Sequence, residues 1–284
     1  MCLDTKFGGD VMKKVLGFSI LLLTVLLFSE TLVIKGSNTV FPIAQLWIER
    51  LKEISPELEI TLEGAGSSTG IAALFNKTAD IANSSRWLKE SELEKMHSMG
   101  RYFIPIVIGY DGIAVIVNRK IDLENITLEM LKKIYTGKIR YWNQIDPNLP
   151  KKQIQIYSRN TASGTFETFE KIVLKNEKMA PWVRMVESTR FEVESVEKNP
   201  YAIAYIGIGY VTDEVKVLKV EGILPTKETI LDGTYPISRP LFMFVDATNG
   251  YPEAGAIKKY ITFGLSKEGQ DLVEKAGYIS AYGF

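Results

Sequence analysis

The first ninety residues repeat one pattern, a short β-type run that ends in a small polar turn, and this pattern constrains the fold most. The runs 31–35, 58–62 and 80–83 lead into the turns GSNT, GAGSSTG and SSR. After the first two turns, apolar residues recur at helical spacing. Alternating strands and helices predict an α/β fold with a mostly parallel sheet and helices on both of its faces. In such sheets ligands bind beyond the carboxyl ends of the strands, where these turns lie.

A second feature predicts two lobes rather than one. The run IPIVIGYDGIAVIVN at 104–118 is long and β-rich, and the residues YDG at 110–112 interrupt it. A strand of this kind suits a chain that crosses from one lobe to another, and PLFMFV at 240–245 suits the return crossing. We therefore expect lobe I to comprise 30–108 plus 243–284, and lobe II to comprise 109–242.

Length and charge narrow the class of protein. The chain has 284 residues, of which 46% are hydrophobic, and this is enough for two domains with real cores. Acidic and basic residues balance at 34 each, so no global field attracts nucleic acid or anionic lipid. An anion-binding protein of this composition has to use local groups.

The N-terminal segment, 1–29, is predicted to be an export signal. Lys13 and Lys14 form a basic region, and the apolar stretch 15–28 that follows is short for a transmembrane helix. Met12 is the expected physiological start, and Ser29 supplies a small residue before cleavage. An uncleaved signal anchor is the alternative, and either form places the body of the protein outside the cytoplasm.

Cysteine and histidine usage excludes several kinds of chemistry. Cys2 precedes the expected start at Met12 and follows no apolar stretch, so it is not a lipoprotein cysteine. His97 is the only histidine and lies in a polar stretch. One histidine and no cysteine in the mature chain argue against a zinc site and against a Ser-His-Asp hydrolase. No cofactor is expected.

The segment SRNTASGT at 158–165 is the strongest candidate for an anion site. Ser163 fits a helix N-cap, and Gly164 and Thr165 then supply free N–H groups in the first turn. Arg159 ends the preceding strand, and its guanidinium can donate two parallel hydrogen bonds to a phosphate-like group. The alternative is an ordinary capped helix with a surface arginine.

The other polar turns repeat this geometry. Thr39 can cap the first helix and leave the N–H of Val40 unpaired, and Ser67 stands in the same place at the second helix. Ser85 adds a hydroxyl at the end of a strand, while Arg86 either contacts the anion, orients a neighbour or pairs across the cleft. Each turn alone is explained by simple capping, but together they indicate a shared oxyanion site.

Asp111 suggests which oxyanion is bound. A carboxylate beside an anion is reasonable when the ligand keeps a proton, as phosphate does and sulfate at neutral pH does not. A buried acceptor facing sulfate would be left unpaired, which disfavours that ligand. The alternatives are that Asp111 shapes the bend at 110–112, or that it pairs with Arg159 or Arg86.

At these motifs the chain resembles the periplasmic phosphate-binding proteins of ABC-type phosphate transporters. The resemblance covers nearly the whole mature chain, and its specificity lies in the joint order and spacing of the motifs, which are GSNTVFP, GAGSSTGI, SSR, YDGIAVIVN, IYTGKIRYWNQI, SRNTASGT and the closing segment 266–279. It implies a two-lobed periplasmic binding protein fold of type II that closes over dehydrated phosphate at a hinge.

The resemblance also implies a set of ligands. One branch of the family places an aspartate acceptor where this chain has Ser85, so the acceptor role passes to Asp111 and a donor role to Ser85. The implied phosphate-binding residues are Thr39, Val40, Ser67, Ser85, Asp111, Arg159, Ser163, Gly164 and Thr165.

The expected function is an exported, monomeric solute-binding protein that captures inorganic phosphate and delivers it to a membrane ABC permease. It would work in the periplasm or another extracytoplasmic space, without nucleic acid and without enzymatic activity. The alternatives are a receptor for sulfate, molybdate or tungstate, a signalling receptor of the same fold, and an exported phosphatase.

Overall fold

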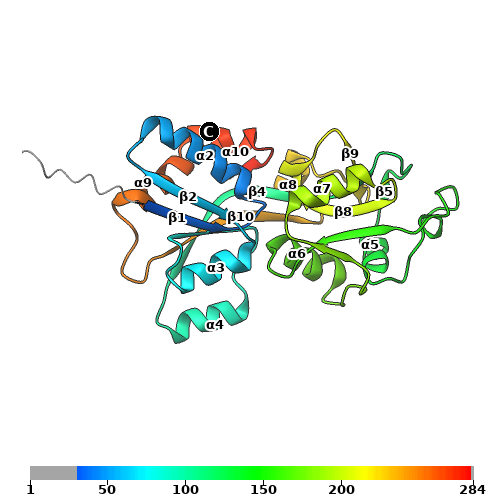
Figure 1. Cartoon of the computed structure of the whole chain (residues 1–284), viewed down its shortest axis with the longest axis horizontal. Coiled ribbons are helices and arrows are strands. Elements are labelled where there is room, and N and C mark those ends of the chain that lie inside the picture. Colours follow the sequence, from blue (N-terminus) through cyan, green and yellow to red (C-terminus); the bar gives the residue numbers. More distant parts are fainter. Residues whose placement is uncertain (1–30, 283–284) are drawn as a thin grey trace, which may run out of the picture.

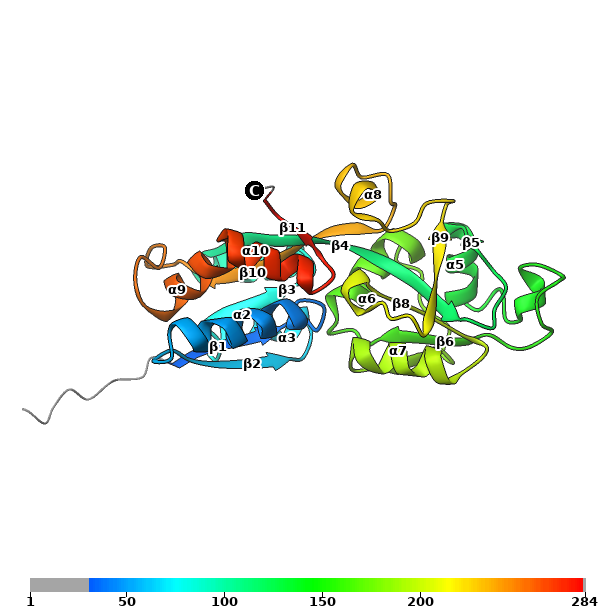
Figure 2. The same ribbon diagram turned by 90° about the horizontal axis from the view of Figure 1, so that it is seen from above.

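The computed structural model describes residues 31–282, and the expected signal segment 1–29 lies outside them. Two α/β lobes lie side by side and are joined by two long antiparallel strands, β4 (Phe103–Asn118) and β10 (Ser238–Asp246) (Figure 1). The expected two-lobed α/β fold is therefore confirmed. Seen from above, β4 and β10 run from one lobe into the other along one side of the molecule (Figure 2).

The first lobe is built on strands in the order β2-β1-β3-β10-β4. β1 is parallel to β2 and β3, whereas β10 is antiparallel to β3 and β4. Helices α2, α9 and α10 cover one face of this sheet, and α3 and α4 cover the other (Figure 1). The remaining elements are β1 (Thr31–Gly36), α2 (Phe41–Ile54), β2 (Glu59–Gly64), α3 (Ser67–Phe75), β3 (Ile81–Ser84), α4 (Glu90–Ser98), α9 (Gly255–Gly264), α10 (Lys267–Lys275) and β11 (Ile279–Ser280).

The second lobe continues the sheet from β4 through β8, β6 and β7. The apolar core of this lobe includes Tyr135, Trp142, Phe169 and Tyr205, all with no exposed surface. Its elements are β5 (Asn125–Ile126), α5 (Leu128–Tyr135), the 3-10 helix η1 (Trp142–Gln144), β6 (Gln155–Arg159), α6 (Gly164–Phe169), the π-helix η2 (Glu170–Leu174), β7 (Arg184–Val186), α7 (Thr189–Lys198), β8 (Ala202–Gly207), the 3-10 helix η3 (Ile208–Tyr210), β9 (Val215–Val220) and α8 (Lys227–Leu231).

The strand across 104–118 differs from expectation in one respect. β4 runs from Phe103 to Asn118 without a break, so Tyr110, Asp111 and Gly112 do not interrupt it. The irregularity lies instead in the partner strand, where the register with β4 shifts between Leu241 and Phe242. Asp111 is therefore not needed to shape a bend, and its buried carboxylate requires another explanation.

Candidate functional site

The turn after β1 is held by a close approach of two backbones. Gly36 has φ +137°, and a Cβ atom at this position would lie 2.1 Å from the carbonyl oxygen of Asn83. The glycine therefore allows the N–H of Ser37 to donate to that carbonyl at 2.8 Å. This contact brings the carboxyl ends of β1 and β3, and the turns that follow them, to one place.

Thr39 lies in this turn, but it is not the helix cap that the sequence suggested. α2 begins at Phe41 after Val40, and in the part of the chain that the structure describes its N-cap makes no side-chain hydrogen bond. The Thr39 hydroxyl instead lies 3.0 Å from that of Thr165 in the second lobe. Both threonines are buried. The Thr39 hydroxyl therefore contacts the second lobe and does not cap α2.

Arg239 of β10 completes this contact, and the sequence analysis missed it. Its Nη2 donates to Thr165 Oγ1 at 3.0 Å and lies 3.4 Å from Thr39 Oγ1. The residue is only 6% exposed, and within residues 31–282 its Nη1 has no hydrogen-bond partner. A buried guanidinium that has an N–H group without an acceptor can bind an anion through a charge-assisted hydrogen bond.

Asp111 is the counter-ion of Arg239. Its Oδ2 accepts from Nη2 at 2.7 Å and from Nε at 2.9 Å, and its Oδ1 accepts from the N–H of Ile208 at 2.9 Å. Burial raises the pKa of the fully buried Asp111 carboxyl, while the charge and hydrogen bonds of Arg239 oppose the rise. We take the carboxyl as ionised because three N–H groups point at it. The alternative partners suggested by the sequence, Arg159 and Arg86, are not the ones found.

Ser67, Ser85 and Gly164 form a second contact between the lobes. Ser67 Oγ accepts from the N–H of Ser85 at 3.1 Å, and the two hydroxyl oxygens are 3.4 Å apart. A Cβ atom on Gly164 would lie 2.4 Å from Ser67 Oγ and 2.7 Å from Ser85 Oγ. Only glycine permits the start of α6 to approach the first lobe this closely.

Ser163 caps α6 as predicted. Its hydroxyl accepts from the N–H groups of Thr165 at 3.2 Å and Phe166 at 3.4 Å. The hydroxyl of Ser163 and the N–H of Thr165 are therefore engaged within the helix. The N–H groups of Val40, Ser67 and Gly164 stand at the starts of three helices, where the helix itself offers no acceptor. All three helix starts belong to the same interlobe region.

Arg159 is buried at the end of β6, but it makes no hydrogen bond to the other predicted residues. Nη1 donates to Thr189 Oγ1 at 2.9 Å, and Nη2 donates to the carbonyl of Glu187 at 2.6 Å. Asn38, the neighbour of Thr39, donates to the same carbonyl at 3.1 Å. Arg159 thus lies at the boundary between the lobes, because the carbonyl to which it donates is shared with Asn38 in the turn that carries Thr39.

The lobes are closed on each other, and Glu167 of α6 is the centre of the closure. It lies 2.5 Å from Arg86 Nε and 2.9 Å from Lys89 Nζ, and it accepts from the Ser68 hydroxyl at 2.7 Å. Glu92 holds Arg86 in place with two 2.8 Å contacts. The pairing across the cleft considered for Arg86 is therefore present. We call these contacts of Glu167 the Glu167 latch.

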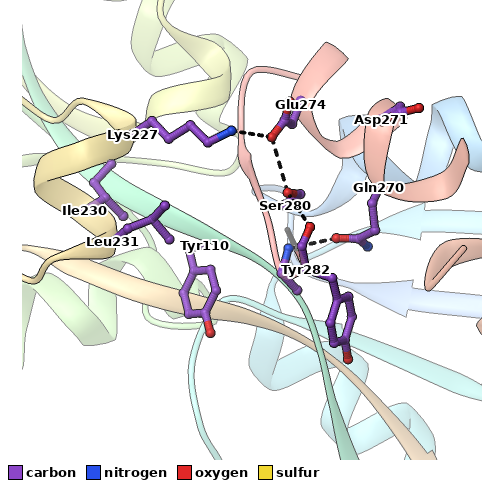
Figure 3. Close-up of a pocket in the computed structure, with 10 residues that line it drawn as sticks. Tyr110, Lys227, Ile230, Leu231, Gln270, Asp271, Glu274, Ser280 and Tyr282 are labelled. Carbon is purple, nitrogen blue, oxygen red and sulfur yellow. Dashed lines mark hydrogen bonds and ion pairs between the residues drawn. The ribbon is translucent and has the colours of Figure 1, made fainter. Parts of the chain in front are cut away.

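A cavity of about 490 Å³ lies elsewhere, on the hinge side of β4, between α8 and α10 (Figure 3). Lys227 of α8 pairs with Glu274 of α10 at 2.6 Å, and Ser280 donates to the same carboxylate at 3.2 Å. Asp271 adds a second carboxylate to the lining. Two carboxylates against one ammonium group disfavour an anion, so the buried interlobe cluster is the better candidate site.

Comparison with known proteins identifies the family to which this chain belongs. A family model described as the PBP superfamily domain matches residues 29–268. The phosphate-binding protein PstS of Borreliella burgdorferi is 34% identical over 94% of this chain and 99% of its own length. The chain belongs to the PstS family of the PBP superfamily.

Other members of the PstS family agree with this assignment. PstS of Staphylococcus haemolyticus is 30% identical over 87% of this chain and 80% of its own length. A phosphate ABC transporter substrate-binding protein of Clostridium perfringens, solved with bound phosphate, has 32% identity and a TM-score of 0.81, covering 89% of this chain and all of the other. A phosphate transport receptor of Vibrio cholerae has 30% identity and a TM-score of 0.70, covering 87% of this chain and 99% of the other.

Within residues 31–282, no helix combines the length and the apolar character needed to cross a membrane. In the same range, histidine, cysteine, aspartate and glutamate side chains form no group of three that would suit a metal ion.

Proposed function

We propose that this PstS-family protein captures inorganic phosphate between its lobes, outside the cytoplasm, and passes it as a monomer to a membrane ABC permease. Lobe I would comprise 30–108 plus 243–284 and lobe II 109–242, with β4 and β10 as the hinge. The relatives are named for phosphate binding, and one was solved with phosphate bound.

One observation carries the proposal. The hydroxyls of Thr39 and Thr165 come from different lobes, meet at 3.0 Å, and share the buried Arg239, whose Nη1 has no hydrogen-bond partner within the described residues. Hydroxyl and guanidinium donors gathered in a dry place suit a small oxyanion. Because each lobe contributes one threonine, the donor shell is complete only when the lobes are closed, and the ligand favours closure.

The proposed ligand groups are those predicted from the sequence, with Arg239 added: Thr39, Val40, Ser67, Ser85, Asp111, Arg159, Ser163, Gly164, Thr165 and Arg239. Within this set we assign Asp111 two tasks. It fixes Arg239, and its remaining lone pairs accept the proton that phosphate carries. Sulfate would leave those lone pairs facing an acceptor, which costs affinity.

The same enclosure argues against an exported phosphatase. Ser67, Thr39 and Thr165 are at most 2% exposed, so the substituent of a phosphate ester has no space beside them. A receptor that dehydrates its ligand on all sides suits the free ion. The buried hydroxyls also have no histidine beside them to act as a base, since His97 lies on α4.

The test is chemical analysis of what the purified protein carries. Protein purified without added phosphate and then denatured should release about one phosphate per chain, measured by molybdate colorimetry. Arg159→Ala, which removes one charge-assisted donor, should retain about 10-fold less after dialysis. Release of another oxyanion, or hydrolysis of p-nitrophenyl phosphate that Arg159→Ala abolishes, would contradict the proposal.

A further inference from the structure

Glu192, on α7, is a buried carboxylate to which the proposed site gives no role. The residue is fully buried. Within residues 31–282, neither of its carboxylate oxygens has a hydrogen-bond partner. An ionised carboxylate in such a place is costly unless a cation faces it. Glu192 therefore needs either a nearby positive charge or a proton.

The facing cation is Arg159. Thr189 accepts from Arg159 Nη1 at 2.9 Å, and Glu192 lies three residues further along α7, on the same helical face. Arg159 Nε is buried and, like the Glu192 oxygens, has no hydrogen-bond partner in the described chain. Within the described residues, Arg159 therefore keeps one donor without a partner and Glu192 keeps two acceptors without partners, while Thr189 of the same helix binds Arg159.

The electrostatics agree with this geometry. Burial raises the pKa of Glu192 well above its usual value, and the charge of Arg159 opposes the rise. Burial lowers the pKa of Arg159, and the charge of Glu192 is the first influence against that. The charge of Glu192 also acts on Tyr135 and Tyr205, and burial raises the pKa of both tyrosines, so they stay neutral. Arg159 is the only charged group in this set.

We propose that Glu192 is the counter-charge of Arg159 and a positioning residue for the phosphate site. In the ligand-free protein it holds the buried guanidinium by charge. When the anion contacts Arg159, Glu192 takes up a proton from solvent, and the guanidinium charge is then matched by phosphate. This inference rests on the proposed function, because it assigns Arg159 to phosphate. It parallels the direct Asp111–Arg239 pair, so that Arg159 and Arg239 each have a buried carboxylate as counter-charge.

The test compares phosphate affinity in wild type and Glu192→Gln by calorimetry across a range of pH. The protonation of phosphate itself changes with pH in the same way in both titrations. The ratio of the two phosphate dissociation constants, wild type over variant, therefore reports only the protonation of residue 192. The variant should gain affinity relative to wild type as pH rises, by about 10-fold for each pKa unit by which the anion shifts Glu192. A ratio that stays constant across the range would overturn the proposal.

Control variants separate the effect of the Glu192 carboxylate on phosphate binding from a general effect on charge or on folding stability. Glu194→Gln removes a half-exposed carboxylate two residues away, which pairs with Arg190 at 3.2 Å, and it should leave the ratio flat. Glu192→Asp keeps a titrating group and should restore a pH-dependent profile. If Glu192→Gln unfolds, Glu192→Met, of similar length and without charge, replaces it in the same comparison. Failure of wild type to bind phosphate would refute the proposed function rather than this inference.

Discussion

Asp111 and Arg239 face each other across the two hinge strands, with Oδ2 of the carboxylate 2.7 Å from Nη2 and 2.9 Å from Nε of the guanidinium. Both side chains are buried, and the two residues are paired in the register of β4 with β10. The ion pair therefore lies within the hinge itself. Nη2 also reaches the two threonines, and among residues 31–282 no hydrogen-bond partner is found for Nη1.

The first prediction separates the structural role of this pair from its role in binding. Arg239→Gln leaves Asp111 buried without a cation and should cost about 3–5 kcal/mol of unfolding free energy. The double variant Arg239→Gln/Asp111→Asn should recover much of that stability in urea unfolding. It should not recover phosphate affinity, because the donors to the anion are still missing. Recovery of affinity in the double variant would show that Arg239 acts only structurally.

The second prediction concerns closure at Gly164. In Gly164→Ala the new methyl group would meet Ser67 Oγ at 2.4 Å, so the lobes cannot approach fully. Phosphate affinity should fall by about 100-fold or more, which corresponds to roughly 2.7 kcal/mol, while the melting temperature of the ligand-free protein changes little. Gly222→Ala is the control, because apart from its chain neighbours no heavy atom of residues 31–282 lies within 4 Å of the added methyl group, and φ is +82°. That variant should lose some stability and keep its phosphate affinity.

The third prediction concerns the Glu167 latch. Glu167→Gln removes the charge that faces Arg86 and Lys89, which are 7% and 44% exposed in their side chains. The partly buried contact should contribute about 1–2 kcal/mol to the closed state, so phosphate should dissociate roughly 5- to 30-fold faster. Stopped-flow measurements at low and high salt check this. The salt dependence of dissociation should be smaller in the variant, and an unchanged rate would show that closure does not depend on the latch.

The fourth prediction is the pH dependence of stability through Glu192. The pKa of this carboxyl is raised in the folded protein by burial and is about 4.3 in the unfolded chain. The folded state therefore binds more protons between these two values, and its stability falls as pH rises through that window. Glu192→Gln removes this loss, so its unfolding free energy relative to wild type should increase with pH. A difference that does not change with pH would mean that folding does not raise the pKa of Glu192.

The sequence predicted the two-lobed fold because the informative signals were local. Polar turns after strands and helical spacing after turns are properties of short segments, and Ser163 caps its helix as expected. Thr39 was read as a cap for the same local reason, and this was wrong because its hydroxyl has a partner 126 positions away in the sequence.

The roles of Arg239 and Glu192 were not predicted, because both depend on packing between segments that are far apart in the sequence. Arg239 pairs with a residue 128 positions earlier, through strand register that no local pattern encodes. The one available signal was an arginine directly before the apolar run 240–245. Glu192 lies in a polar helix whose sequence predicts a solvated face, and only the fold shows that this carboxylate is buried.

The most direct test of the central claim is calorimetric titration of ligand-free wild-type protein with phosphate and then, separately, with sulfate. The account predicts one phosphate bound per chain, little or no heat with sulfate, and a much smaller preference between the two ions in Asp111→Asn. No binding of phosphate, or equal affinity for both ions in the wild-type protein, would contradict it.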